Sequence, residues 1–317
     1  MKKNNTLYIV VPCYNEEEVI METTKQLNKK VDDLIEKKII SNNSRVMYVN
    51  DGSKDDTWNL IQKITEEYDY FIGISLSRNC GHQNALLAGL MTAKEKADIV
   101  ISMDADLQDD INTIDKMIDE YNSGSEIVYG VRSSRKKDTW FKRNTALFFY
   151  KFMNFLGVNI VYNHADYRLM SKRALDELEN YKEVNLFLRG IIPLIGFKTS
   201  CVYYERLERF AGKSKYPLKK MLNFALEGVL SFSVKPIRLI TVSGIVIATL
   251  SLLMLLYTII GHFVSGNVAG WTTIIVLICF FGGFQIFCIG IIGEYIGKIY
   301  QETKQRPRYI IEKRVGE

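Results

Sequence analysis

Two long apolar stretches near the C-terminus constrain the fold of this chain more than any other feature. Residues 237–263 and 271–292 are almost free of charged side chains. Each is longer than the ~20 apolar residues that a helix needs to cross a bilayer. The connection between them, residues 264–270, is uncharged and too short for a domain. We therefore expect two transmembrane helices that form a hairpin. Two buried core helices are the alternative interpretation.

Charged residues around these stretches predict how they cross the membrane. Lys235 and Arg238 flank the first stretch, and Lys298, Lys304 and Arg306 follow the second, whereas the connection has no charge. Because short cytoplasmic loops carry an excess of lysine and arginine, both ends are expected in the cytoplasm. The N-terminus lacks the apolar core and cleavage site of a signal peptide, which agrees with this orientation. We therefore predict a multi-pass protein of the cytoplasmic membrane.

The stretch directly before the first apolar run has a different pattern. Between residues 215 and 235, apolar side chains recur at helical spacing and polar ones occupy another face. An amphipathic helix of this kind fits a position at the membrane surface. The predicted segments are an N-terminal domain (1–214), this interfacial helix (215–235), a membrane segment (236–297, with helices at about 237–263 and 271–297) and a cytoplasmic tail (298–317).

The first 130 residues alternate between apolar runs and helical patterns at least four times. This order requires an α/β fold with a mostly parallel sheet and helices on both faces. The expected strands are residues 7–11, 45–49, 71–76, 99–103, 127–130 and, at an edge, 198–205. The expected helices are residues 16–38, which Asn15 would cap, and about 57–64, 82–96, 111–121 and 172–181. No G-x-G-x-x-G follows the first strand, which argues against a dinucleotide fold.

Polar residues follow several of these expected strands. Ligands of parallel α/β sheets bind at the carboxyl ends of the strands, where residues 12–16, 51–53, 78–83 and 104–108 would meet. Asp104 and Asp106 are spaced so that both can point the same way. Two close carboxylates repel unless a cation or proton intervenes, and Mg²⁺ or Mn²⁺ suits such oxygen ligands together with substrate phosphates. The alternative interpretation is a solvated acidic turn.

Composition excludes several other classes of site. The five cysteines are scattered, odd in number and without a C-x-x-C pair, which argues against a disulfide framework or a zinc ribbon. The three histidines lie too far apart for metal-ligand spacing. The net charge of +5 is small, so local basic clusters matter more. One such cluster, residues 206–216, is a glycine-containing loop that could hold phosphate or be a solvated linker.

Taken together, these motifs resemble a known family. The sequences VVPCYNE at 10–16, NDGS at 50–53 and DADLQ at 104–108 look like the inverting glycosyltransferases of family 2, whose fold is called GT-A. The sequence ADYRL at 165–169, the basic loop at 209–216 and the membrane hairpin narrow the likeness to polyprenyl-phosphate glycosyltransferases. That group includes bactoprenol glucosyltransferases and dolichol-phosphate mannose synthases. A Q-x-x-R-W motif, typical of processive polysaccharide synthases, is absent from the sequence.

The resemblance implies a role for each matching residue. The nucleotide's base and ribose would contact Pro12, Tyr14, Glu16 and Asp51, and the donor site would be completed by Asp104, Ala105 and Arg132. The metal, Mg²⁺ or Mn²⁺, would bind Asp104, Asp106 and Gln108. Catalysis would involve Asp106 and Asp166, the latter through acceptor activation or sugar positioning. Phosphates would be bound by Arg206, Arg209 and Lys213.

The implied activity is transfer of a sugar to polyprenyl phosphate, such as undecaprenyl phosphate, for cell-envelope glycosylation. UDP-glucose or a UDP-N-acetylhexosamine is the expected donor, and GDP-mannose is the alternative. The expected partners are these two substrates and the membrane, and no nucleic acid is expected. Whether the chain forms a homo-oligomer is left open. Two rival classes are a non-catalytic nucleotide-binding protein, which would not need both Asp104 and Asp106, and a transporter subunit. Two spans without a central charge make a poor translocation path.

Overall fold

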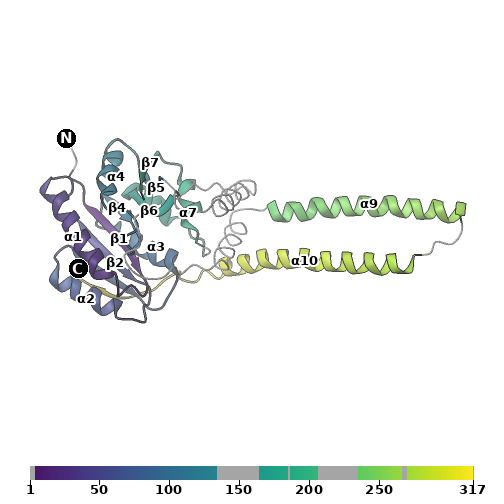
Figure 1. Cartoon of the computed structure of the whole chain (residues 1–317), viewed down its shortest axis with the longest axis horizontal. Coiled ribbons are helices and arrows are strands. Elements are labelled where there is room, and N and C mark those ends of the chain that lie inside the picture. The colour runs from purple at the N-terminus through teal and green to yellow at the C-terminus, as the bar shows by residue number, and fades with distance from the viewer. Residues whose placement is uncertain (1–3, 134–163, 185, 206–234, 266–269, 317) are drawn as a thin grey trace. The chain divides into compact units, whose positions relative to one another are not determined.

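The computed structural model describes residues 4–133, 164–184, 186–205, 235–265 and 270–316, and the chain divides into two compact units (Figure 1). The first unit combines three stretches that are separated in the sequence, Met1–Tyr150, Ile160–Pro217 and Arg306–Glu317. The second unit consists of Lys151–Asn159 and Leu218–Gln305. Most of the second unit, Leu218–Gln305, is therefore an insertion in the sequence between two parts of the first unit.

The described part of the first unit contains an eight-stranded sheet in the order β7-β5-β6-β4-β1-β2-β3-β8. The parallel strands are β1 (Leu7–Cys13), β2 (Arg45–Asn50), β3 (Phe71–Leu76), β4 (Ile99–Ser102), β5 (Ile127–Arg132) and β7 (Thr199–Tyr204). Two strands run antiparallel to them, β6 (His164–Ser171) and β8 (Ile311–Val315). The predicted mostly parallel sheet is confirmed, and β7 is the edge strand expected at residues 198–205.

Helices cover both faces of this sheet. They are α1 (Ile20–Glu36), α2 (Thr57–Glu67), α3 (His82–Ala93), α4 (Thr113–Asn122), α6 (Lys172–Glu179), α7 (Leu188–Ile191) and the 3₁₀ helix η1 (Ile192–Ile195). On β1, Ile9 belongs to the apolar core shared with α1, α2 and α4. The next residue, Val10, faces α3, where a Cβ on Gly89 would lie only 2.3 Å from its Cγ1. Alternate residues of one strand therefore pack into two separate helical layers.

Two local predictions in this unit are wrong. The first helix begins at Ile20 rather than Glu16, and Asn15 does not cap it. Asn15 has a positive φ of 53°, and its Oδ1 accepts a hydrogen bond from the Lys54 amide at 2.9 Å. Asparagine tolerates this left-handed conformation better than most residues, so Asn15 joins two loops instead. Strand β6 was not expected either, because its charged Asp166 and Arg168 are unusual inside a sheet.

The second unit contains two long helices, α9 (Lys235–Ser265) and α10 (Trp271–Thr303). Large apolar side chains on both are exposed, among them Leu250, Ile286 and Ile289. Among the described residues, one helical stretch, Phe280–Thr303, is long and apolar enough to cross a membrane, and Ile237–Ser251 is a shorter apolar stretch. One span is therefore supported, and the two-span hairpin stays a prediction. The interfacial helix predicted at residues 215–235 lies almost entirely outside the described residues.

After α10 the chain returns to the first unit and adds the strand β8. Arg308 Nη2 donates to the Tyr181 carbonyl at 2.8 Å, and the Ser77 amide donates to the Ile310 carbonyl at 3.0 Å. Strand β8 then pairs antiparallel with β3, and Val315 packs against the core. The segment predicted as a cytoplasmic tail thus contains a strand that covers the edge of β3.

Removing this strand is expected to destabilise the first unit. A protein that ends at Tyr309 loses the β8 ladder, and at ~1 kcal/mol per backbone hydrogen bond the loss is about 2–4 kcal/mol. This corresponds to a fall in melting temperature of roughly 4–16 °C. Fluorescence of Trp58, which is half-buried on α2 against the core, can report thermal unfolding. For this measurement the other two tryptophans, Trp140 and Trp271, are replaced by phenylalanine.

The matched control is Lys313→Ala, which shortens an exposed β8 side chain and keeps the backbone pairing. Its melting temperature should equal that of the full chain. An unchanged melting temperature in the truncated protein would show that β8 contributes nothing to the stability of the sheet.

Candidate active site

The loops after β1 and β2 are joined by hydrogen bonds at the carboxyl edge of the sheet. The amide of Asn15 donates to Ser53 Oγ at 3.0 Å, and the amide of Glu16 donates to Thr57 Oγ1 at 2.9 Å. Side chains after β2 thus accept hydrogen bonds from backbone amides of the loop after β1, which connects the two segments. Three residues predicted to bind the nucleotide lie in this joined segment, namely Pro12, which is buried in β1, and the half-buried Tyr14 and Glu16.

Asp51 connects the end of β2 to the loop that follows β3. Its side chain is buried and accepts hydrogen bonds from the amides of Cys80 at 2.7 Å and Gly81 at 3.0 Å. Its own amide donates to the Cys13 carbonyl at 2.9 Å. Burial raises the pKa of Asp51, and the two amide donors act in the opposite direction. This predicted nucleotide-binding residue is thus also a structural link between three loops.

Gly52 permits the close approach of these loops. Its φ is +63°, and a Cβ at this position would lie 2.5 Å from the Asn79 amide nitrogen. A side chain here would therefore meet backbone atoms as well as strain its own conformation.

Asp166 lies at the centre of a charged cluster formed by four elements. It belongs to β6 and is only 6% exposed. Arg168 Nη2 donates to its Oδ1, and Arg189 of α7 donates twice, from Nε to Oδ1 at 3.2 Å and from Nη2 to Oδ2 at 3.0 Å. His82 Nε2, at the start of α3, lies 3.5 Å from Asp166 Oδ2 and 3.8 Å from Asp104 Oδ1. We call His82, Asp104, Asp166 and Arg189 the central cluster.

The carboxylates of the central cluster differ in their affinity for protons. Burial acts to raise the pKa of Asp166, but Arg189, His82 and Arg168 together hold this pKa well below its usual range. Burial raises the pKa of Asp104 to about 6, with His82 opposing the shift and nearby carboxylates adding to it. Burial lowers the pKa of His82, yet Asp166 and Asp104 outweigh this and raise it overall. Asp166 is therefore the carboxylate held most firmly as an anion.

A second buried group orients Arg132, the predicted donor-side arginine. Arg132 Nη2 donates to Asp109 Oδ1 at 3.3 Å, and its Nε donates to the Tyr204 hydroxyl at 3.4 Å. Tyr204 in turn donates to Asp109, whose side chain is fully buried. Asp109 and Tyr204 thus hold the end of β5 against β7 and fix the direction of a guanidinium that is one-quarter exposed.

The acidic turn after β4 contains the other predicted donor and metal residues. Asp104, Asp106 and Gln108 are half-buried, and Ala105 is buried, with its carbonyl accepting from Thr23 Oγ1 at 2.8 Å. The Gln108 amide donates to Asp106 Oδ1 at 3.2 Å. The described residues contain no group of three or more His, Cys, Asp or Glu that could bind a metal alone. Two carboxylates suffice, however, for a Mg²⁺ ion that completes its shell with water and substrate phosphates.

Several residues around the site were not predicted. The histidines were set aside because of their spacing, although His82 stands in a segment, 78–83, that was placed at the carboxyl edge. Arg189 and Tyr204 had no signal, since each meets its partner only through the fold. The three basic residues predicted to bind phosphate, Arg206, Arg209 and Lys213, lie outside the described residues.

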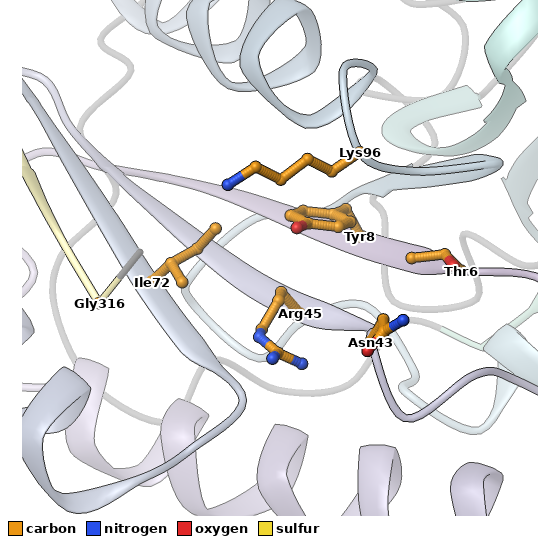
Figure 2. A pocket seen from close by; sticks show the side chains of 7 residues that line it. All are labelled: Thr6, Tyr8, Asn43, Arg45, Ile72, Lys96 and Gly316. Carbon is orange, nitrogen blue, oxygen red and sulfur yellow. The ribbon is translucent and has the colours of Figure 1, made fainter.

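A cavity of about 450 Å³ lies at the opposite edge of the sheet, where β1, β2 and β3 begin (Figure 2). It is lined by Thr6, Tyr8, Asn43, Arg45, Ile72, Lys96 and Gly316. Figure 2 shows Lys96 and Arg45 on either side of the Tyr8 ring. None of these residues belongs to the central cluster, so the cavity is separate from the site at the carboxyl edge.

Comparisons with known proteins identify the family. Residues 8–179 match the profile of Glycosyl transferase family 2, and residues 235–299 match the GtrB C-terminal hairpin. The chain belongs to glycosyltransferase family 2. It is therefore a glycosyltransferase, with a GT-A-like mixed α/β sheet and a C-terminal hairpin domain. This domain and the apolar helix within it indicate association with a membrane.

Relatives match almost the whole chain. An uncharacterized glycosyltransferase of Bacillus subtilis, YkoT, is 56% identical over 96% of this chain and 91% of its own length. The bactoprenol glucosyl transferase of Shigella phage SfX is 40% identical over 96% of this chain and 98% of its own length. Among solved structures, a mannosyltransferase of Pyrobaculum calidifontis in complex with GDP-Man and Mn²⁺ has 15% identity and a TM-score of 0.43, covering 93% of this chain and 88% of that one.

Substitution of Gly52 by alanine should disrupt the loops around Asp51. We expect Gly52→Ala to lower the free energy of unfolding by about 1–3 kcal/mol and to break the hydrogen bonds from Cys80 and Gly81. Hydrogen exchange of those two amides should therefore become faster. Gly196→Ala is the matched control, because Gly196 also has a positive φ of 74° but its nearest neighbouring atom would lie 3.9 Å from the added Cβ. Equal exchange rates in the two variants would contradict the role of close contact at Gly52.

Proposed function

We propose that this protein transfers a hexosyl unit from a nucleotide sugar to a polyprenyl phosphate at the cytoplasmic face of the membrane. UDP-glucose or a UDP-N-acetylhexosamine is the proposed donor. The observation that carries this proposal is the 40% identity with a bactoprenol glucosyl transferase over 96% of the chain, a match that includes the catalytic domain and the hairpin. The product is a polyprenyl-phosphate sugar that can serve cell-envelope glycosylation.

The donor is proposed to lie along the carboxyl edge of β1, β2 and β4. Its base and ribose would contact Pro12, Tyr14, Glu16 and Asp51, which the hydrogen bonds between the loops hold in place. Arg132, directed by Asp109 and Tyr204, would face the donor diphosphate. The residues at 206–213 would bind phosphate as well. Fixed donors and charges of this kind stabilise a developing negative charge without having to reorganise during the reaction.

A divalent cation, Mg²⁺ or Mn²⁺, bound by Asp104, Asp106 and Gln108, would neutralise charge on the leaving diphosphate. The residues fit such a cation because two carboxylates and an amide oxygen, all oxygen ligands, lie in one turn. Nearby carboxylates also contribute to the raised pKa of Asp104. Asp106 receives an amide hydrogen bond on Oδ1. This contact fixes the direction of the Asp106 carboxylate in the turn.

The reaction itself requires little proton transfer. A phosphate oxygen of the lipid attacks the anomeric carbon from the side opposite the nucleotide, and the bond from that carbon to the diphosphate breaks. The electron pair leaves with the nucleoside diphosphate, and the configuration inverts. Because the lipid phosphate is already an anion near pH 7, no strong base is needed. The low pKa of Asp166 makes it a weak base, which favours its role in positioning.

The membrane segment would keep the active site beside its lipid substrate. We propose two membrane-spanning helices at residues 237–263 and 271–297, preceded by an interfacial helix at 215–235. The positive charges around them support a cytoplasmic location of the catalytic domain, where nucleotide sugars are made. Holding both reactants at one surface raises their effective concentration.

A donor panel tests the proposal directly. The purified full-length protein, in detergent with a short polyprenyl phosphate and Mg²⁺, should transfer sugar from UDP-glucose or a UDP-N-acetylhexosamine. Transfer from GDP-mannose alone would replace the donor assignment with that of a mannose synthase. Binding of nucleotide without transfer from any donor would overturn the proposed activity.

The acidic turn should be essential for this transfer. We expect Asp106→Ala to lower turnover by at least about a hundredfold, because the cation loses a ligand, and excess EDTA should have the same effect on the unchanged protein. Asp119→Ala, an exposed acid on α4, is the matched control and should retain full turnover. Unimpaired transfer by Asp106→Ala, or by protein freed of metal, would remove the proposed metal role.

The proposed topology predicts a labelling pattern. In a protein whose native cysteines, Cys13, Cys80, Cys201, Cys279 and Cys288, are replaced, Ser265→Cys should react with an impermeant maleimide in intact cells. Asn4→Cys should react only after lysis, because the proposed orientation, inferred from the lysines and arginines that flank the apolar stretches, has the N-terminal domain in the cytoplasm. The reverse pattern would mean that the sugar is not loaded onto lipid at the cytoplasmic face.

A further inference from the structure

Both oxygens of Asp166 are already occupied by cationic neighbours. Oδ1 accepts from Arg168 Nη2 and Arg189 Nε, and Oδ2 accepts from Arg189 Nη2, with His82 Nε2 at 3.5 Å. A carboxylate offers about four lone-pair sites in total. A substrate group could bind Asp166 directly only by displacing one of these neighbours. Contact with the substrate therefore falls more readily to a neighbour than to Asp166 itself.

The two arginines hold Asp166 from different sides. The Arg168 side chain is 1% exposed, whereas the Arg189 side chain is 32% exposed. Arg168 thus compensates the charge of Asp166 from inside the sheet. Arg189 pairs with the same carboxylate through two nitrogens, which fixes the plane of its guanidinium, and it keeps part of its surface open to solvent. A planar, two-point pair of this kind orients a guanidinium for binding of an oxyanion.

The position of Arg189 is also fixed through its backbone. The amide of Leu188, the preceding residue, donates to Gln83 Oε1 at 3.1 Å. Gln83 follows His82 in α3, so one turn of α3 contacts both Asp166 and the start of α7. Ser102 Oγ donates to the Asp166 carbonyl at 2.5 Å and connects β6 to β4. The central cluster is therefore held by contacts from β4, β6, α3 and α7.

The negative charge of the carboxylates in and near the central cluster explains why a positively charged side chain is needed to receive a phosphate there. Asp104 and Asp166 are carboxylates, and Asp106 lies two residues beyond Asp104. An incoming phosphate would be repelled by these anions unless a positive group met it first. His82 Nε2 lies close to both Asp104 and Asp166, and the partly exposed Arg189 pairs with Asp166. In an inverting reaction the attacking phosphate enters opposite the leaving diphosphate.

We propose that Arg189 binds a phosphate oxyanion of the substrates, most directly the phosphate of the acceptor lipid, and that Asp166 and His82 are positioning residues that orient Arg189. This inference rests on the proposed function, since it names the group that receives the anionic acceptor. The shared chemistry is a phosphate oxyanion, and the donor diphosphate is the other source. Steady-state measurements with each substrate varied separately distinguish the two.

The test compares Arg189→Gln and Arg189→Lys with the unchanged full-length protein. We expect Arg189→Gln to raise the acceptor KM by at least about tenfold, since a charge-assisted contact is lost, with the donor KM within about twofold. The acceptor KM of Arg189→Lys should lie between those of the unchanged protein and Arg189→Gln, because lysine retains the charge without the two-point geometry. Guanidinium ion added to Arg189→Ala should restore part of the loss. A rise in the donor KM alone would assign Arg189 to the donor diphosphate.

The matched control is Arg173→Gln. Arg173 is 68% exposed and pairs with Glu126, away from the central cluster. Both KM values should stay unchanged in this variant. If Arg189→Gln behaves like Arg173→Gln while the unchanged protein transfers sugar, the proposed role of Arg189 is wrong and the proposed function stands.

Asp166→Asn separates positioning from base catalysis. If Asp166 orients Arg189, its variant should raise the acceptor KM as Arg189→Gln does, and the double variant should be no worse than either single one. A base would instead lower kcat at saturating acceptor, and the two losses would multiply. Thermal melting of each variant verifies that it is folded.

Direct binding supplies a measurement that does not depend on turnover. A short polyprenyl phosphate should bind the protein in nanodiscs more weakly after Arg189→Gln, whereas the matching uncharged polyprenol should bind both proteins alike. Equal affinity of the two proteins for the phosphate, together with an unchanged donor KM, would overturn the inference.

Discussion

The sheet depends on the neutralisation of a buried carboxylate. Strand β6 lies between β4 and β5, well inside the sheet, yet it carries Asp166 and Arg168. A buried charge is costly unless it is paired and hydrogen-bonded. Arg168 and Arg189 provide that pairing, so β6 can run antiparallel through a sheet that is otherwise parallel up to β8. The same contacts bring α7 and α3 together at the carboxyl edge. The fold and the central cluster therefore have one electrostatic origin.

The rest of the site is assembled mainly by contacts between backbone amides and side chains. Asp51 receives amides of the loop after β3, and Ser53 and Thr57 receive amides of the loop after β1. Such contacts hold loops in a fixed relation without apolar packing, and they leave the edge polar enough for a charged ligand. Preorganised loops lower the conformational entropy that binding would otherwise remove.

The sequence was sufficient to predict the parts of the fold that arise from local patterns. Apolar runs predicted β1 to β5, and the polar residues after them predicted which loops meet at the carboxyl edge of the sheet. Asn15 was assigned wrongly because the same residue type can cap a helix or adopt a positive φ, and only the position of Lys54 decides between them. Strand β6 was missed because its charges are compatible with burial only when they are paired, and one partner of Asp166, Arg189, meets it only through the fold. Strand β8, with the polar sequence IEKRV, has no strong local signal and is ordered by pairing with β3 and by the contact of Val315 with the core. His82 and Arg189 meet through tertiary contacts that no spacing in the sequence encodes.

The separation between β3 and β8 has a consequence for synthesis. Leu76 pairs with Ile311, so the ribosome must add 235 residues (311 − 76) before this pairing can begin. At about 5–20 residues per second this interval is on the order of tens of seconds, and both long apolar helices are made within it. The edge of β3 therefore stays without β8 while α9 and α10 are synthesised. Completion of the sheet becomes a late event, one that follows translation of both long helices, α9 and α10.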